Sequence, residues 1–402
     1  MKRICMVTHS FYESDNRIIR YAEALAARGD EVHVIALRRQ PGLPLEELTN
    51  GVNLHRIQDR FGKNESSSWS FLWPLLRFTL ASSGWLIRWS RPGFDVVHVH
   101  NIPDFLVFAA WYPKLCGAKV ILDIHDIVPE FFASKFGKLP DSVLLRALRL
   151  MEKASAAMAD RVILANHLWL AAYCARSAPA AKCSVVVNHV DEQVFRPLAR
   201  RRIGTEPTIV FPGGLQWHQG LDIAIRAFAV LRTRMPTARF KIYGDGNMKR
   251  KLVALVAELG IDGAVRFHAP VPLRAIAQVM ADADLGVVPK RADSFGNEAY
   301  STKIMEFMAV GVPVIVSRTR VDQHYFDDSV VRFFPSGDHE ALAQAMYELL
   351  SDAAARAALI GKARHYVAGN GWSQHKHEYL GLVDSLLPRE RMLLDTTREA
   401  KP

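Results

Sequence analysis

Two glutamates and a lysine, Glu298, Glu306 and Lys303, lie close together in the stretch GNEAYSTKIMEFMAVGVPVIVS, residues 296–317. If a helix begins near Lys303, the lysine lies in its first turn, where its charge opposes the helix dipole. A bound anion would reverse that penalty, because the N–H groups of a first turn favour phosphate. The alternative is a lysine that extends into solvent. Two carboxylates flanking a phosphate site suit the hydroxyl groups of a nucleotide sugar.

The residues around Lys303 predict a strand, a loop and a helix in that order. DLGVVP (284–289) predicts the strand, and KRADSFGNEAYS (290–301) predicts the loop. TKIMEFMAV (302–310) predicts the helix, with Ser301 or Thr302 as its cap. Gly311 is expected to end it in the left-handed conformation, and Pro313 prevents its continuation. The spacing of the two glutamates is common by itself; its place in a strand–loop–helix unit makes it specific, because open α/β sheets bind ligands at such turns.

Length and composition predict a large, basic α/β protein of two domains. The chain has 402 residues, of which 50% are hydrophobic, and a formal net charge of +10. The charge fits a solvated surface, an anionic substrate or an anionic membrane surface. Zinc-finger spacing and RNP-like aromatic motifs are missing from the sequence, so we expect no nucleic-acid partner. We expect the N-terminus to form a first strand and not a signal peptide.

The cysteines predict a reducing, cytoplasmic compartment. No pair has C-x-x-C spacing, and we expect Cys5 and Cys116, which lie in apolar runs, to be buried free thiols.

The segment Trp69 to Phe94 raises the question of membrane contact. Arg77, Arg88 and Pro74 interrupt it, and no run reaches the length needed to span a bilayer. Its aromatic and arginine residues suit an interfacial helix. The alternative is a core helix that buries one face and leaves its arginines in water.

Apolar runs separated by helical stretches occur twice along the chain, which predicts two doubly wound α/β domains. The polar, basic stretch NHVDEQVFRPLARRRIGTEP contains the expected linker. We predict an N-terminal acceptor-side domain at 1–195, a linker at 196–206 and a donor domain at 207–371. An amphipathic helix in 372–402 is expected to pack back on the first domain.

NEAYSTKIMEFMAVGVPVIVS resembles the donor-site motif of the retaining glycosyltransferases of the GT-B fold, glycosyltransferase family 4 (glycosyl transferases group 1). FPGGLQWHQGLDIAIRAFAVL, YGDGNMKRKL, VVVNHVDEQVFRP, DVVHVHNIPD and ILDIHDIVPE resemble other segments of the family, so the likeness covers most of the chain. It implies two Rossmann-like domains facing across a cleft.

The resemblance implies roles for individual residues. Glu306 would bind the ribose, Glu298 the transferred sugar, and His125 would touch that sugar from the first domain. Together with Lys303 they form the expected catalytic set. The residues expected to bind the donor are Gly213, Gly214, His218, Gly244, Asp245, Val271, Ser301, Thr302 and Glu306.

The sequence also departs from the family. Many relatives carry an arginine and a lysine where this chain has Gly214 and Gln219, so the usual cations on the leaving diphosphate are missing. Lys303 is the expected substitute. The residues expected to assist it, or to contact acceptor or phosphate, are Arg17, His100, Asp126, His218, Lys290 and Arg291. For Arg17, a solvated surface position is the equal alternative.

We therefore predict a retaining hexosyltransferase that moves a sugar from a nucleotide-diphosphate donor to an acceptor hydroxyl. The acceptor is expected to be a lipid-linked or surface-polysaccharide intermediate, with peripheral membrane contact. No cofactor or metal is expected: HDxxPE and HxH are conceivable ligand sets, but neither has clear partners. The alternatives are a nucleotide-sugar epimerase of the same fold and a non-catalytic partner subunit. The sequence leaves the base, sugar and linkage open.

Overall fold

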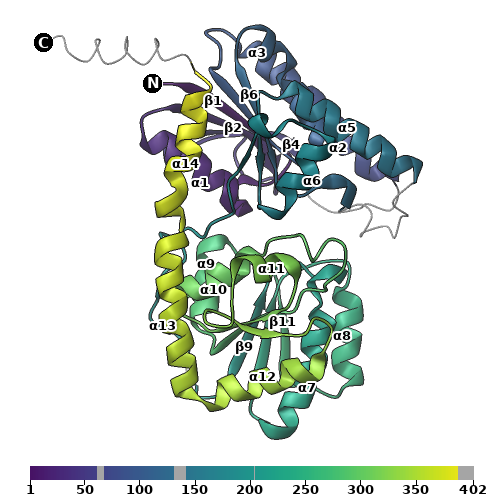
Figure 1. Cartoon of the computed structure of the whole chain (residues 1–402), viewed down its shortest axis with the longest axis vertical. Coiled ribbons are helices and arrows are strands. Elements are labelled where there is room, and N and C mark those ends of the chain that lie inside the picture. The colour runs from purple at the N-terminus through teal and green to yellow at the C-terminus, as the bar shows by residue number, and fades with distance from the viewer. Residues whose placement is uncertain (61–67, 131–141, 203, 388–402) are drawn as a thin grey trace, which may run out of the picture. The chain divides into compact units, whose positions relative to one another are not determined.

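The computed structural model describes residues 1–60, 68–130, 142–202 and 204–387, and the chain divides into two compact units (Figure 1). The first comprises Met1–Asn188 together with the chain from Lys376 onward, and the second comprises His189–His375. The sequence-based boundary of the first domain was residue 195, and the structural division falls earlier.

The first unit contains a sheet in the order β3-β4-β2-β1-β5-β6-β7-β8, parallel except for β3. The order reverses between β1 and β5, so the turns after these two strands flank a topological switch point. The strands are β1 Arg3–Thr8, β2 Glu31–Arg38, β3 Glu46–Thr49, β4 Val52–Asp59, β5 Val96–His100, β6 Lys119–Ile124, β7 Arg161–Leu164 and β8 Cys183–Val185. The helices are η1 Tyr12–Ser14, α1 Asn16–Ala27, α2 Ser68–Arg88, η2 Asp104–Ala110, α3 Trp111–Leu115, α5 Val143–Met158, α6 Leu168–Arg176, η3 Ala180–Lys182 and α14 Trp372–Ser385, which crosses from the second unit.

Helices cover both faces of this sheet, as parallel strands require. One face packs against α2, η2, α5 and α6 through side chains such as Phe78, Leu106, Ala156 and Trp169. The other face carries α1 and α14, whose Tyr21 and Tyr379 rings stack with centroids 3.8 Å apart (Figure 1).

The second unit is a six-stranded parallel sheet in the order β11-β10-β9-β12-β13-β14. Its switch point lies between β9 and β12. Helices α7, α8 and α12 cover one face, and α9, α10 and α13 cover the other (Figure 1). The strands are β9 Thr208–Pro212, β10 Arg239–Tyr243, β11 Val265–His268, β12 Leu285–Val288, β13 Val314–Ser317 and β14 Arg332–Phe334. The helices are η4 Trp217–Gln219, α7 Leu221–Arg234, α8 Lys249–Glu258, α9 Leu273–Ala281, α10 Thr302–Val310, α11 Arg320–Tyr325, α12 His339–Ser351 and α13 Ala353–Asn370.

Two expectations need correction, and one pair of strands was not predicted. Ser301 is the N-cap residue of α10, but its side chain makes no capping hydrogen bond. Cys116 is exposed rather than buried, whereas Cys5 is buried as expected. The sequence did not predict the antiparallel pair β3 and β4.

The predicted linker is held to the second unit by ion pairs. Arg200 and Arg202 both contact the carboxylate of Asp284, each at 2.8 Å. These contacts attach the chain at Arg200 and Arg202 to the start of β12.

Helix α2 packs one face into the core, as the core-helix alternative for the 69–94 segment predicts, because the side chains of Phe78 and Leu86 are fully buried. Among the described residues, no helix is both long enough and apolar enough to cross a membrane.

Candidate active site

Two glycine turns meet at the carboxyl ends of β9 and β10, beside the switch point of the second sheet. Gly213, after β9, has φ of 136°, a conformation that favours glycine. A Cβ at Gly244, after β10, would lie 1.8 Å from the carbonyl oxygen of Gly213, and a Cβ at Gly213 would lie 3.2 Å from Cε of Lys303. Only glycines therefore let these two turns and the lysine pack this closely.

Lys303 lies in the first turn of α10, beside these glycines. Its Nζ donates a hydrogen bond of 3.1 Å to Oε1 of Gln219, and it lies 5.7 Å from the ring centre of Phe211. The buried hydroxyl of Ser301 has no hydrogen-bond partner among the described residues. The helix start therefore presents a hydroxyl, N–H groups and an amine.

The charge of Lys303 is only partly stabilised in the free protein. Loss of solvent lowers its pKa to about 8, although Glu306 and Asp322 oppose that change and Lys290 adds to it. The neutral Gln219 supplies no counter-charge. A phosphate bound at α10 would supply one.

The other predicted cations of this unit are already paired. Lys290 is almost fully buried, and its Nζ lies 2.9 Å from Asp322 and donates to the carbonyl of Ala299 at 2.6 Å. Arg291 pairs with Asp222 at 2.5 Å and lies over the Trp217 ring. These contacts hold the 290–301 loop in place and neutralise both cations.

His218 lies in the loop after β9 and packs edge-on against Phe295, with ring centroids 5.0 Å apart. Burial, followed by the Lys303 charge, lowers the pKa of His218 to about 4. It is therefore neutral near pH 7.

The two glutamates have different surroundings. Glu306 is buried, one helical turn after Lys303, whereas Glu298 is partly exposed and pairs with Arg320 at 3.1 Å. Asp245 is exposed and lies near Lys249. Val271, in the loop after β11, is partly exposed.

In the first unit, Arg17 and Asp123 form a buried ion pair below the end of β6. Their exposed fractions are 2% and 0%, and two guanidinium nitrogens donate to the two carboxylate oxygens at 2.8 Å. Burial alone would raise the pKa of Asp123, but the Arg17 charge holds it well below its usual value. The expectation of a solvated surface Arg17 is wrong.

Three histidines surround the same carboxylate. Oδ2 of Asp123 lies 3.2 Å from His100 Nδ1, 3.3 Å from His125 Nε2 and 3.7 Å from His98 Nε2. Burial lowers the pKa of His98 and His100, so both are neutral near pH 7. Tyr379 of α14 hydrogen-bonds Nδ1 of His98 at 3.0 Å.

Asn101 positions the turn that carries His125. Its Oδ1 accepts the N–H of His125 at 2.7 Å, and its Nδ2 donates to the carbonyl of Asp126 at 2.8 Å. Asp126 is partly exposed, and burial raises its pKa to about 6.

The nitrogen and oxygen atoms of His98, His100 and Asp123 lie within 4.8 Å of one another, as metal ligands do. However, Arg17 already balances the charge of Asp123, and a dication would add uncompensated charge to a fully buried position. The cluster fits a hydrogen-bond network better than a metal centre.

Sequence reasoning did not assign roles to Asp123, Asn101 or Gln219. Asp123 carried a signal, since it is a carboxylate inside the apolar strand KVILDI. Asn101 carried none, because a polar residue is ordinary in a loop, and Gln219 was marked only as the place of a missing cation.

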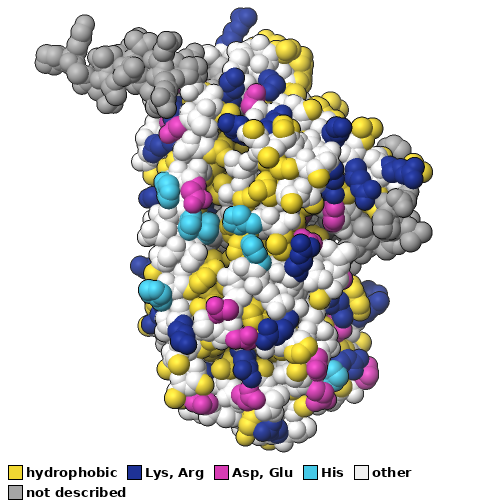
Figure 2. Space-filling model, in the orientation of Figure 1, with side chains coloured by type: hydrophobic (Ala, Val, Ile, Leu, Met, Phe, Trp, Pro, Cys, Tyr) yellow, Lys and Arg dark blue, Asp and Glu magenta, His cyan; other side chains and the backbone are white. Residues whose placement is uncertain are grey.

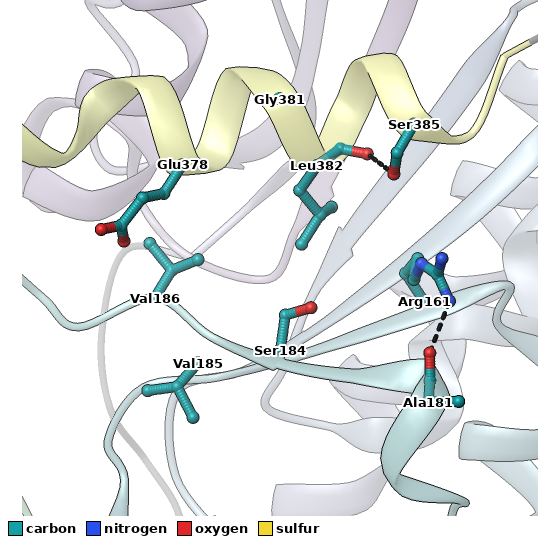
Figure 3. A pocket seen from close by; sticks show the side chains of 9 residues that line it. All are labelled: Arg161, Ala181, Ser184, Val185, Val186, Glu378, Gly381, Leu382 and Ser385. Atoms are coloured by element: carbon teal, nitrogen blue, oxygen red, sulfur yellow. Dashed lines mark hydrogen bonds between the residues drawn. The ribbon is translucent and has the colours of Figure 1, made fainter.

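A pocket beside α14 is not part of this site. It measures about 460 Å³ and opens between β8 and α14 in the first unit (Figure 3). The residues that line it are Arg161, Ala181, Ser184, Val185, Val186, Glu378, Gly381, Leu382 and Ser385. None of the predicted site residues belongs to this set.

Comparison with known families agrees with the fold. Residues 198–366 match the family described as glycosyl transferases group 1, and residues 15–189 match a glycosyl transferase 4-like domain. A D-inositol 3-phosphate glycosyltransferase of Thermobispora bispora is 33% identical over 383 residues, which cover 89% of this chain and 86% of that protein. The chain belongs to the group 1 glycosyltransferases. This glycosyltransferase uses a nucleotide-sugar donor.

Solved structures show the same fold. The sucrose-phosphate synthase of Thermosynechococcus elongatus has a TM-score of 0.76 at 19% identity, with 96% of this chain and 100% of that chain covered. Anabaena HepE in complex with UDP and glucose has a TM-score of 0.73 at 16% identity, with the same coverage. The predicted GT-B fold of the glycosyltransferase is confirmed.

Proposed function

We propose that the glycosyltransferase is a retaining hexosyltransferase whose donor diphosphate binds at the start of α10. One observation carries this proposal: Lys303 lies against Gly213 and donates a hydrogen bond to the amide of Gln219, beside a Ser301 hydroxyl that has no partner among the described residues. Gln219 stands where many relatives have a cation, and Nζ of Lys303 donates a hydrogen bond to its side chain. In this proposal the amine of Lys303 supplies the charge that those relatives place at position 219.

In the proposed reaction, the bond between the sugar carbon and the diphosphate oxygen breaks, and its electron pair leaves with the diphosphate. The acceptor hydroxyl attacks the same face of the sugar, and its proton passes to the departing phosphate. Lys303 and the first-turn N–H groups of α10 stabilise the developing negative charge. Because these groups supply the positive charge, we expect the transfer to need no metal.

The remaining roles follow from position and resemblance. Glu306, buried on α10, binds the ribose hydroxyls, and Glu298 orients the transferred sugar. Glu298 is an unsuitable nucleophile because Arg320 pairs with it. His125 is assigned to the transferred sugar by resemblance alone.

The proposed acceptor is a lipid-linked saccharide of surface-polysaccharide assembly, reached from the cytoplasmic side of a membrane. The exposed apolar and basic side chains of α2 and α5 support this assignment.

The test is a binding and product experiment. Thermal-shift measurements with UDP, GDP and ADP identify the nucleotide, and NMR of the product sugar gives its anomeric configuration. We expect stabilisation by one nucleoside diphosphate, retained configuration and unchanged turnover in EDTA. Inversion would overturn the mechanism, and hydrolysis of donor without transfer would favour an epimerase.

A further inference from the structure

Helix α2 has an apolar outer face as well as an apolar inner face. Phe78 and Leu86 fill the core, yet Trp73, Leu80 and Ile87 are exposed at helical spacing on the opposite side. Leu80 is 71% exposed. An ordinary surface helix carries polar residues there, so burial by the described part of the chain does not account for the composition of α2.

The short helices next to α2 continue this surface. Phe108 of η2, Trp111 and Leu115 of α3 are all exposed. The indole N–H of Trp111 donates to the hydroxyl of Ser83 in α2 at 2.9 Å, which joins the two elements. The apolar surface therefore extends from α2 across α3.

Helix α5 shows the same pattern on the same face of the sheet. Its Ala156 packs into the core that α2 also fills, while Val143, Leu144, Leu150 and Met151 are exposed. Figure 1 places α2 and α5 on the same side of the first sheet, and Figure 2 shows yellow and dark blue side chains interspersed there. We call α2, η2, α3 and α5 the apolar–basic surface.

The exposed charges of this surface are positive. Its acids are withdrawn from solvent or paired: Asp104 and Glu152 are buried, and Asp160 forms an ion pair with Lys114 at 2.8 Å. The exposed cations on or next to these helices are Arg77, Arg88, Arg91, Arg146, Arg149 and Lys153.

We propose that the apolar–basic surface docks on an anionic phospholipid membrane. Exposed tryptophan and leucine side chains would enter the headgroup region, and the arginines would pair with lipid phosphates. Isolated exposed apolar residues are normal, but a group this large on adjoining elements marks an interaction surface. The charge selects lipid over a second copy of this chain, because two copies would bring like charges together.

This inference rests on the proposed function in one respect, since it names the surface that would bring the enzyme to a lipid-linked acceptor. It also extends the membrane hypothesis from the 69–94 segment to α3 and α5. Binding to lipid can nevertheless be measured without donor or acceptor.

The test is flotation with vesicles of phosphatidylcholine alone or mixed with phosphatidylglycerol. We expect the full chain to float with the mixed vesicles, to remain behind with phosphatidylcholine alone, and to be released by salt. The double variant Leu80→Glu/Leu150→Glu should lower partitioning at least about tenfold. The matched control is Leu48→Glu, because Leu48 is also 71% exposed and lies in the same unit outside this surface.

A second pair of variants tests the charge. Arg88→Glu/Arg149→Glu should weaken flotation, whereas Arg226→Glu, at an exposed site of the second unit, should not. Wild-type protein that stays behind with both vesicle types overturns the proposal. A dimer in light scattering that Leu80→Glu dissociates, without flotation, would make this surface a subunit interface.

Nucleoside-diphosphate binding separates this proposal from the proposed function. It should be unchanged in all these variants. Failure of flotation with intact nucleotide binding would remove the membrane surface and leave the transferase chemistry.

Discussion

Each sheet has a buried cation near its switch point, and the two cations differ in how far their charge is balanced. Arg17 in the first unit is fully matched by Asp123, with two hydrogen bonds of 2.8 Å. Lys303 in the second unit hydrogen-bonds to an amide, and burial lowers its pKa. Removing one partner of a buried pair leaves an uncompensated charge that destabilises the fold, whereas a cation with only part of its charge balanced can gain a bound anion. The comparison predicts a structural role for Arg17 and a chemical role for Lys303.

The largest expected effect is on catalysis. Lys303→Ala should lower kcat about 1,000-fold, equivalent to about 4 kcal/mol, because the departing diphosphate loses its cation. The unfolding midpoint should change little. Steady-state kinetics with matched denaturant melts measures both, and Lys362→Ala, at an exposed lysine of the same unit, serves as the control. Near-normal turnover would assign the charge to another residue.

The second effect is on stability. Arg17→Met should lower the free energy of unfolding by about 3 kcal/mol, because Asp123 is left buried without its partner. Urea melts measure the loss. Arg38→Met, which breaks an exposed pair with Asp59, should cost much less. The double variant Arg17→Met/Asp123→Leu should recover part of the stability. If it does not, the contacts of Asp123 with the surrounding histidines contribute more to the stability than its pair with Arg17.

The smallest effect is a pH dependence of nucleotide affinity. Above about pH 8 the free protein holds Lys303 neutral, while a bound diphosphate favours its charged form. Binding then takes up a proton, so the dissociation constant should rise toward about tenfold per pH unit. His218, with its pKa near 4, stays neutral over this range and does not contribute.

Calorimetry between about pH 7 and 9 measures this slope. Lys303→Arg should flatten it, because arginine remains charged. An equal slope in that variant would show that Lys303 is not the titrating group.

Local signals predicted the second unit well. The bounds of α10 and the left-handed Gly311 at its end agree with the sequence-based prediction, because the residues next to a helix end determine where it stops. The alternating polar strand β4 was missed: its His55 and Arg56 are buried through pairing with other residues, and pairing partners are distant in sequence.

The same limit applies to the site. Sequence position indicated Lys303, but not that Lys290 would be neutralised by Asp322 or that Asn101 would hold the His125 turn. Such partners lie on other elements, and only the folded chain brings them together. The roles of the site residues themselves remain predictions.

The stacking of Tyr379 on Tyr21 has a consequence for biosynthesis. The first unit lacks this ring, and the hydroxyl that contacts His98, until residues 189–375 have been translated. At ordinary elongation rates that takes roughly 10–40 s. During this interval the Tyr21 side of α1 is not covered by α14. A chaperone that shields exposed aromatic side chains on the ribosome would therefore improve the yield of active protein.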